Sequence, residues 1–198
     1  MIAAPGAEGA NPQARAVFLD RDGVLNRSKL IDGIPRPPAS ADELELLPGV
    51  EEACRELGDA GLLLIVVTNQ PDIARGTQSE AEVDEINRRL AQQLPLDEIR
   101  VCPHDDGDRC GCRKPAPGML LDAAREHGIV LESSVMVGDR WRDIEAGRRA
   151  GCRTVFIDTG YPERAPEAPD LKVRRLDEAV PWILERSAEG RPDHAHSR

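Results

Sequence analysis

The sequence predicts an α/β fold of three layers, in which a parallel β-sheet lies between two layers of helices. Short apolar runs alternate along the chain with segments whose apolar residues recur at helical spacing, a pattern typical of parallel sheets with crossover helices. The length of 198 residues suits one domain with a substantial core. Aromatic residues make up only 3% of the chain, so Leu, Val, Ile and Ala must build that core.

The predicted strands are the short apolar runs, whose length is that of strands buried in a parallel sheet. They cover residues 16–19, 62–67, 99–102, 135–138 and 154–157. The first predicted helix follows Pro48-Gly49 and is closed by Gly61. Ser79 with Glu82 forms a capping-box pattern that opens the second. The predicted buried faces of these two helices consist of Val50, Ala53, Cys54 and Leu57, and of Val83, Ile86, Leu90 and Leu94.

Three further helices are predicted in the second half of the chain. They span Gly118–His127, Arg142–Ala150 and Leu176–Arg186. Gly128 and Gly151 stop the first two of these helices. Pro181 is expected near the first turn of the last helix, where its missing N–H is tolerated.

Both ends of the chain are expected to be disordered tails. Residues 1–14 are rich in Ala, Gly and Pro without periodicity, and residues 187–198 are polar, which places the domain at residues 15–186. His194 and His196 lie in the second tail, and we expect no metal role for them.

Charge and hydropathy narrow the range of partners. The 26 basic and 36 acidic residues give a net charge of −10, which disfavours nucleic acid or an anionic membrane as the main partner. No apolar stretch approaches the ~20 residues of a membrane span, and the first residues lack the pattern of a signal peptide. A cytoplasmic location is therefore expected. A monomeric state is expected because no extended apolar face is evident in the sequence.

Asp20 and Asp22 directly follow the first predicted strand. Residues two apart in a strand share a face, so the two carboxylates converge where the chain leaves the sheet, and Gly23 allows the turn that follows. Such a pair can hold a cation and divide the roles of nucleophile and proton carrier. A solvated Asp-rich turn is the alternative interpretation.

Three other predicted strands lead to further polar groups. These groups are Thr68-Asn69-Gln70, Arg113-Lys114-Pro115 and Asp139, with Asp143 one helical turn later. Because ligands bind at the carboxyl ends of parallel strands, we expect all of them in one site. Taken singly, Thr68 could be a strand residue with a satisfied hydroxyl, Lys114 a solvated charge and Asp139 a helix cap. Asp143 could orient Lys114 or favour the helix dipole.

The order of acid pair, hydroxyl, lysine and second acid resembles the haloacid dehalogenase superfamily of aspartate-nucleophile phosphatases, over roughly Val17 to Ile157. The resemblance implies a Rossmann-like fold. It implies that Asp20 attacks phosphorus and that Asp22 is the general acid and base. Mg²⁺ is then expected on the Asp20 carboxylate, the Asp22 carbonyl and the Asp139 carboxylate. Thr68 and Lys114 are expected on the phosphoryl oxygens. The expected substrate-binding residues are Asn69, Gln70, Arg113 and Arg140.

Cysteine and histidine cluster after the third predicted strand. Cys102, His104, Cys110 and Cys112 supply three thiolates and one imidazole, the ligand set of a closed structural Zn²⁺ site. Unrelated reduced cysteines beside a surface histidine are the alternative. Because Arg113 follows the last ligand, a zinc-clamped loop would orient Arg113 and its neighbour Lys114. Cys54 and Cys152 are interpreted as small buried thiols.

Together with Arg-Lys-Pro, this cluster is similar to the branch that contains heptose 1,7-bisphosphate phosphatases and histidinol-phosphate phosphatases. The segments 27–47 and 102–118 are too short for a large cap domain. The resemblance implies a Mg²⁺-dependent phosphomonoester hydrolase that acts through a phosphate ester on Asp20, with a heptose bisphosphate as the expected substrate.

Several alternatives stay open at this point. Histidinol phosphate is the nearest rival substrate, since Asp32 or Asp72 could meet its amine. Pro71-Asp72 stands where heptose phosphatases often have Ser-Gly, which puts the sugar in doubt. Residues 31–40 could form a rigid substrate-side loop or a plain surface connector. A zinc-stabilised binding module without activity is the rival outside enzymology.

Overall fold

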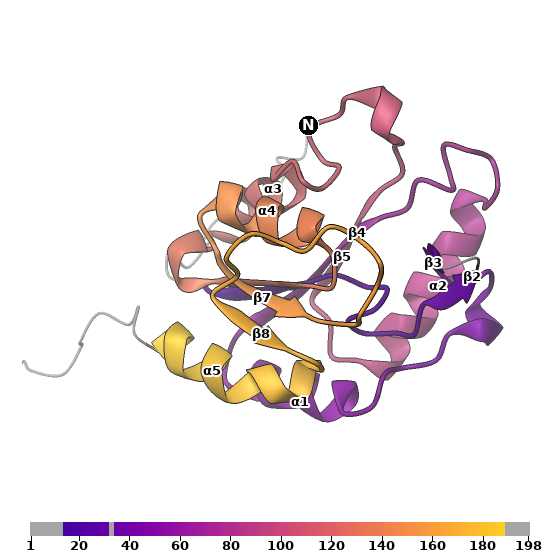
Figure 1. Cartoon of the computed structure of the whole chain (residues 1–198). Coiled ribbons are helices and arrows are strands. Elements are labelled where there is room, and N and C mark those ends of the chain that lie inside the picture. The colour runs from indigo at the N-terminus through magenta and orange to yellow at the C-terminus, as the bar shows by residue number, and fades with distance from the viewer. Residues whose placement is uncertain (1–13, 32–33, 189–198) are drawn as a thin grey trace, which may run out of the picture.

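The computed structural model describes residues 14–31 and 34–188 (Figure 1). Its centre is a six-stranded parallel sheet of strand order β5-β4-β1-β6-β7-β8. The strands are β1 (Ala16–Leu19), β4 (Leu63–Asn69), β5 (Glu98–Cys102), β6 (Val135–Gly138), β7 (Arg153–Ile157) and β8 (Leu171–Val173). From β1 the chain adds β4 and then β5 on one side of the sheet. It then crosses back and adds β6, β7 and β8 on the other side of β1. The strand order therefore reverses between β1 and β6, which is where open α/β sheets bind ligands.

Helices cover both faces of the sheet, as Figure 1 shows. On one face lie α1 (Val50–Asp59), α2 (Glu80–Gln93) and α5 (Leu176–Ala188), and on the other lie α3 (Gly118–His127) and α4 (Trp141–Ala150). Successive strand side chains alternate between the faces. Val17 and Leu19 of β1 pack in the first core, and Ala16 and Phe18 pack in the second. The predicted three-layer α/β fold is confirmed.

The helix ends follow the local chemistry of the sequence. Ser79 Oγ accepts from the backbone N–H of Glu82, and the Glu82 carboxylate accepts from the N–H of Ser79 at 2.7 Å. This is the predicted capping box. Gly128 and Gly151 adopt left-handed backbone conformations with φ of 65° and 86° just after α3 and α4, as predicted.

The inserted segments are small. β2 (Lys29–Ile31) and β3 (Ile34–Arg36) pair as antiparallel strands, called the β2–β3 hairpin below, where a loop was expected at residues 31–40. Strand β8 was not predicted, because its three residues are too few for a periodic signal. Short 3₁₀ turns lie at Ala41–Glu43, Asp106–Asp108 and Leu131–Ser133. Within the described residues the chain carries no large cap domain, as expected from the short segments.

The expectation for Pro181 is wrong, since it is the sixth residue of α5 and lies inside the helix. A proline there cannot donate a hydrogen bond to the carbonyl of Asp177. The helix nevertheless continues because Ala179, Val180 and Ile183 are buried against the sheet. Packing therefore outweighs the lost hydrogen bond.

The predicted tails lie mostly outside the described residues, and so do His194 and His196. At the inner edges, the N–H of Val130 donates to the Ala14 carbonyl at 2.8 Å, and Ser187 is buried at the end of α5. Cys54 and Cys152 are buried free thiols, as predicted. Among the described residues, no helix combines the length and the apolar character that crossing a membrane requires.

Alanine substitutions at two helical glycines are expected to change the stability of the protein in opposite directions. A Cβ on Gly147 of α4 would lie 2.7 Å from Cβ of Met136 and 2.9 Å from Cγ2 of Thr154, so Gly147→Ala overpacks the helix–sheet contact. We expect this change to lower the free energy of unfolding by about 1–3 kcal/mol, reduced somewhat by alanine's better helix propensity. A Cβ on Gly58 of α1 would meet nothing within 4 Å. We expect Gly58→Ala to raise that free energy by about 0.5–1 kcal/mol.

Urea denaturation of both variants beside the wild type measures these changes. A Gly147→Ala protein as stable as the wild type would show that α4 is free to move away from β6 and β7. That result would contradict the close approach.

Candidate active site

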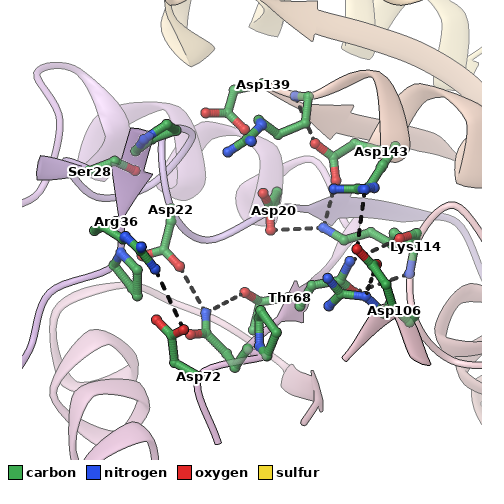
Figure 2. A pocket seen from close by; sticks show the side chains of 18 of the residues that line it. Asp20, Asp22, Ser28, Arg36, Thr68, Asp72, Asp106, Lys114, Asp139 and Asp143 are labelled. Carbon is green, nitrogen blue, oxygen red and sulfur yellow. Dashed lines mark hydrogen bonds and ion pairs between the residues drawn. The ribbon is translucent and has the colours of Figure 1, made fainter. Parts of the chain in front are cut away.

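The polar groups predicted from separate strands meet in one cavity of about 220 Å³ at the carboxyl ends of β1, β4 and β6 (Figure 2). Every residue predicted to bind or transform substrate lines it. These residues are Asp20, Asp22, Thr68, Asn69, Gln70, Arg113, Lys114, Asp139 and Arg140. Asp143 also lines the cavity. The cavity thus lies at the point where the strand order reverses.

Lys114 lies at the centre of the site and is only 2% exposed. Its ammonium donates to Asp20 Oδ1 at 2.8 Å and to the Val67 carbonyl at 2.7 Å, and it lies 2.6 Å from Asp143 Oδ1. An ammonium has three donors, so all three are engaged. Burial alone would lower the pKa of Lys114, but Asp143 and Asp20 raise it above the ordinary value. The side chain is therefore a permanent cation beside Asp20.

Asp143 has both of the roles that were left open. One carboxylate oxygen pairs with Lys114, and the other accepts from the backbone N–H of Arg140 at 2.9 Å, at the start of α4. Asp143 therefore orients Lys114 and also caps the helix that follows Asp139.

Asp20, Asp139 and Asp143 bring carboxylate oxygens within 4.8 Å of one another. Burial raises the pKa of Asp20 to about 6, with Lys114 opposing the shift. Burial also raises the pKa of Asp139, and the charges of Asp20 and Asp143 add to that shift. Asp139 Oδ1 is buried without a hydrogen-bond partner. Three carboxylates against one ammonium leave an excess of negative charge, so the cluster has the donor set and the charge to hold a divalent cation.

Gly23 permits the close approach of the turn after β1 to the side chain of Asp139. Its φ is +89°, and a Cβ there would lie 1.8 Å from Asp139 Oδ2. A side chain at Gly23 would therefore displace Asp139 and strain the backbone. Gly23 therefore has this steric role in addition to its predicted role as the turn residue.

Asp22 is held by hydrogen bonds from several sides. Asn26 donates to Oδ1 at 2.9 Å, and Gln70 donates to Oδ2 at 2.8 Å. Arg21 donates to both oxygens, at 3.3 and 3.0 Å. Gln70 also donates to Thr68 Oγ1 at 2.9 Å, which leaves the Thr68 hydroxyl proton free to be donated elsewhere. Arg21 and Asn26 are not among the site residues that the sequence predicts.

Asn69 contacts the backbone of Lys114 through both atoms of its amide. Nδ2 donates to the Lys114 carbonyl at 3.0 Å, and Oδ1 accepts from the Lys114 N–H at 3.1 Å. In this structure the amide therefore positions Lys114, in addition to lining the cavity where a substrate contact was expected.

The cysteine and histidine cluster is closely gathered beside the cavity. The sulfur of Cys112 lies 3.1 Å from that of Cys102 and 3.4 Å from that of Cys110, and His104 Nδ1 lies 3.3 Å from the Cys112 sulfur. Sulfur ligands around a tetrahedral Zn²⁺ with bonds of about 2.3 Å lie about 3.8 Å apart, so a small expansion would fit the ion. Arg113 donates to the His104 carbonyl at 3.0 Å. The loop therefore holds Arg113 through its own backbone, and the part of Zn²⁺ in orienting Arg113 and Lys114 stays a prediction.

Alternating charges line the rim of the cavity. Asp72 lies 3.7 Å from Arg36 of the β2–β3 hairpin and 3.4 Å from Arg75. Arg113 pairs with Asp106 at 2.8 Å, and Arg140 pairs with Glu163. The hairpin is thus tied to the loop after β4, and Pro35, Arg36 and Pro37 line the cavity. A substrate-side role for residues 31–40 stays a prediction.

Comparisons with known proteins agree with this geometry. The family model described as HAD-hydrolase-like matches residues 111–179. The D-glycero-D-manno-heptose-1,7-bisphosphate 7-phosphatase of Thermosynechococcus vestitus is 37% identical over 85% of this chain and 94% of its own length. The D-glycero-beta-D-manno-heptose-1,7-bisphosphate 7-phosphatase of Bordetella bronchiseptica is 38% identical over 74% of this chain and 82% of its own length.

Solved structures give the same relationship. The crystal structure of the D,D-heptose 1,7-bisphosphate phosphatase from B. bronchiseptica, complexed with magnesium and phosphate, superposes with a TM-score of 0.75 at 34% identity. It covers 86% of this chain and 98% of its own. The resemblance read from the sequence is confirmed, and this chain belongs to the D-glycero-D-manno-heptose-1,7-bisphosphate 7-phosphatase family of haloacid dehalogenase-like phosphatases.

Proposed function

We propose that this chain hydrolyses the 7-phosphate of D-glycero-D-manno-heptose 1,7-bisphosphate through a phosphate ester on Asp20. The observation that carries the proposal is the position of Asp20. Its carboxylate is bonded to Lys114, lies within the cluster of Asp139 and Asp143, and opens on the same cavity as Asp22. A nucleophile beside a permanent cation and a cation-binding cluster suits attack on an anionic phosphoryl group.

In the first step, an Asp20 carboxylate oxygen attacks phosphorus and the bond from phosphorus to the sugar oxygen breaks. Asp22 gives its proton to that oxygen, so the sugar leaves as an alcohol. The Thr68 hydroxyl proton is available to a phosphoryl oxygen. Lys114 favours the ionised form of Asp20, which is the form that attacks.

In the second step, the Asp22 carboxylate takes a proton from water while the water oxygen attacks phosphorus. The bond from phosphorus to Asp20 then breaks, inorganic phosphate leaves, and Asp20 is again a carboxylate. Asp22 ends protonated, as it began, so the cycle balances.

The residues present fit both expected metals. The Asp20 and Asp139 carboxylates and the Asp22 carbonyl would hold Mg²⁺, and the unpartnered buried oxygen of Asp139 supports that assignment. When bound, the ion supplies positive charge that balances the phosphoryl oxygens. Cys102, His104, Cys110 and Cys112 would hold Zn²⁺ in a closed site with a structural role.

The rim favours a sugar phosphate over histidinol phosphate. Asp72, which could have met the amine of histidinol phosphate, is paired with Arg36 and Arg75. Asp32, the other candidate, lies outside the described residues. Arginines outnumber carboxylates at the rim, where Arg36, Arg75, Arg113, Arg140 and Arg142 line the cavity with only Asp72 and Asp106 to balance them. This excess of positive charge suits an anionic substrate better than a cationic one. We further propose a monomer, since Leu121 is the only exposed large hydrophobic side chain among the described residues. We also propose a cytoplasmic location, where the free cysteines of the cluster would stay reduced.

Phosphate release tests the proposed reaction. With Mg²⁺ present, we expect turnover of heptose 1,7-bisphosphate to exceed that of histidinol phosphate and of a 3′-phosphorylated oligonucleotide. Asp20→Asn should reduce kcat by about a thousandfold or more, as removal of a covalent nucleophile does. Asp122→Asn, which removes an exposed charge on α3, is the matched control and should retain activity.

Persistence of wild-type turnover in Asp20→Asn would contradict the covalent route. Mass spectrometry of the protein quenched in acid during turnover should locate an added phosphate on Asp20. Turnover by the wild type without such an adduct would also count against it.

Removal of zinc ligands tests the role of the loop. Cys110→Ser and Cys112→Ser should each lower bound zinc from about one ion per chain and lower kcat/KM by about tenfold or more, since Arg113 and Lys114 lose their fixed position. Cys152→Ala, a cysteine outside the cluster, should keep its zinc. Elemental analysis and phosphate release provide the two measurements. A zinc-free protein with wild-type kcat/KM would refute a positioning role for the ion.

A further inference from the structure

Arg21 is a charged residue that lies in the interior beside the active site. It is 0% exposed, although it stands between Asp20 and Asp22 in the sequence. One guanidinium nitrogen, Nη1, donates to Oδ1 of Asn87 at 2.9 Å. Asn87 lies on α2 and is 8% exposed, so the contact is buried between the helix and the end of β1.

The opposite edge of the same guanidinium contacts Asp22. Nη2 donates to Asp22 Oδ2 at 3.0 Å, and Nε donates to Oδ1 at 3.3 Å. The guanidinium is planar and its donors have a fixed geometry. Its orientation at Asn87 therefore also determines where it meets the Asp22 carboxylate.

The position of Asn87 is unusual for its helix. Its neighbours on the buried face of α2 are Val83, Ile86 and Leu90, so a polar residue interrupts the apolar stripe. Burial of a guanidinium and of the amide that binds it costs free energy that an apolar pair of similar volume would avoid. The pair is therefore better explained by the orientation that it gives to the Asp22 carboxylate than by packing between the helix and the sheet.

We propose that Asn87 and Arg21 are positioning residues for proton transfer by Asp22. Asn87 holds the guanidinium of Arg21, and the guanidinium holds the Asp22 carboxylate toward the cavity. This inference rests on the proposed function, in which Asp22 protonates the departing sugar oxygen. It adds to that function a residue from α2, a helix of which no residue lines the cavity.

Two substrates whose leaving groups differ in their need for a proton can distinguish this role from a merely structural one. A sugar alkoxide departs with help from an acid, whereas p-nitrophenolate departs without one. The parameter kcat/KM reports the steps up to departure of the leaving group and excludes hydrolysis of the phosphate ester on Asp20. We expect Asn87→Leu to lower kcat/KM about 10- to 100-fold for the heptose bisphosphate, within the range of general acid catalysis. For p-nitrophenyl phosphate, kcat/KM should fall by less than about threefold, because p-nitrophenolate departs without a proton from Asp22.

Matched variants complete the test. Asn87→Asp keeps an oxygen acceptor facing Arg21 and should restore kcat/KM for the sugar substrate to within several-fold of the wild type. Gln92→Leu makes a similar change on the exposed face of α2 and should leave both substrates unaffected. In an Asp22→Asn background, Asn87→Leu should add no further selective loss, since the group that it positions is gone.

Equal losses for both substrates, or no loss for either, would overturn the positioning role. The p-nitrophenyl phosphate activity also shows that the Asn87→Leu protein is folded, and circular dichroism confirms it. Failure of the proposed function would look different, because Asp20→Asn would then keep its activity toward both substrates whatever happens at Asn87.

Discussion

The active site depends on one buried ammonium group. Lys114 binds Asp20 from β1, the Val67 carbonyl from β4 and Asp143 from α4, and so connects three segments that are far apart in the sequence. A buried cation with all of its donors engaged is stable only while its anions are present. The same bonds fix the proposed nucleophile and keep it ionised next to the Asp139 cluster. Stability and reactivity therefore depend on the same contacts at this point.

The residues around Lys114 are arranged to hold it in place. Asn69 binds its backbone on both sides of the residue, and Arg113 is tied to the loop that carries the cysteine cluster. The hairpin and the loop after β4 are joined across the rim by Asp72. The protein thus shapes its cavity with short loops and ion pairs, because within the described residues it has no large cap domain to close over it.

Asp22 is supported in a different manner from Asp20. Its carboxylate accepts hydrogen bonds from Arg21, Asn26 and Gln70, none of which carries a negative charge. Asp20 instead lies among other carboxylates and one cation, and burial raises its pKa. Two carboxylates two residues apart therefore have different environments, which is what a division between nucleophile and proton carrier requires.

The sequence alone determined the alternation of strands and helices, because hydrophobic period and capping patterns are local properties. It also predicted that Asp20, Thr68, Lys114 and Asp139 would share one edge of the sheet, since three of them directly follow apolar runs and Lys114 lies in the loop after another. Only the tertiary structure decided what each polar group contacts. Asn69 binds Lys114, Asn87 binds Arg21, and β8 forms from three residues, because such contacts join residues far apart in sequence and leave no periodic trace.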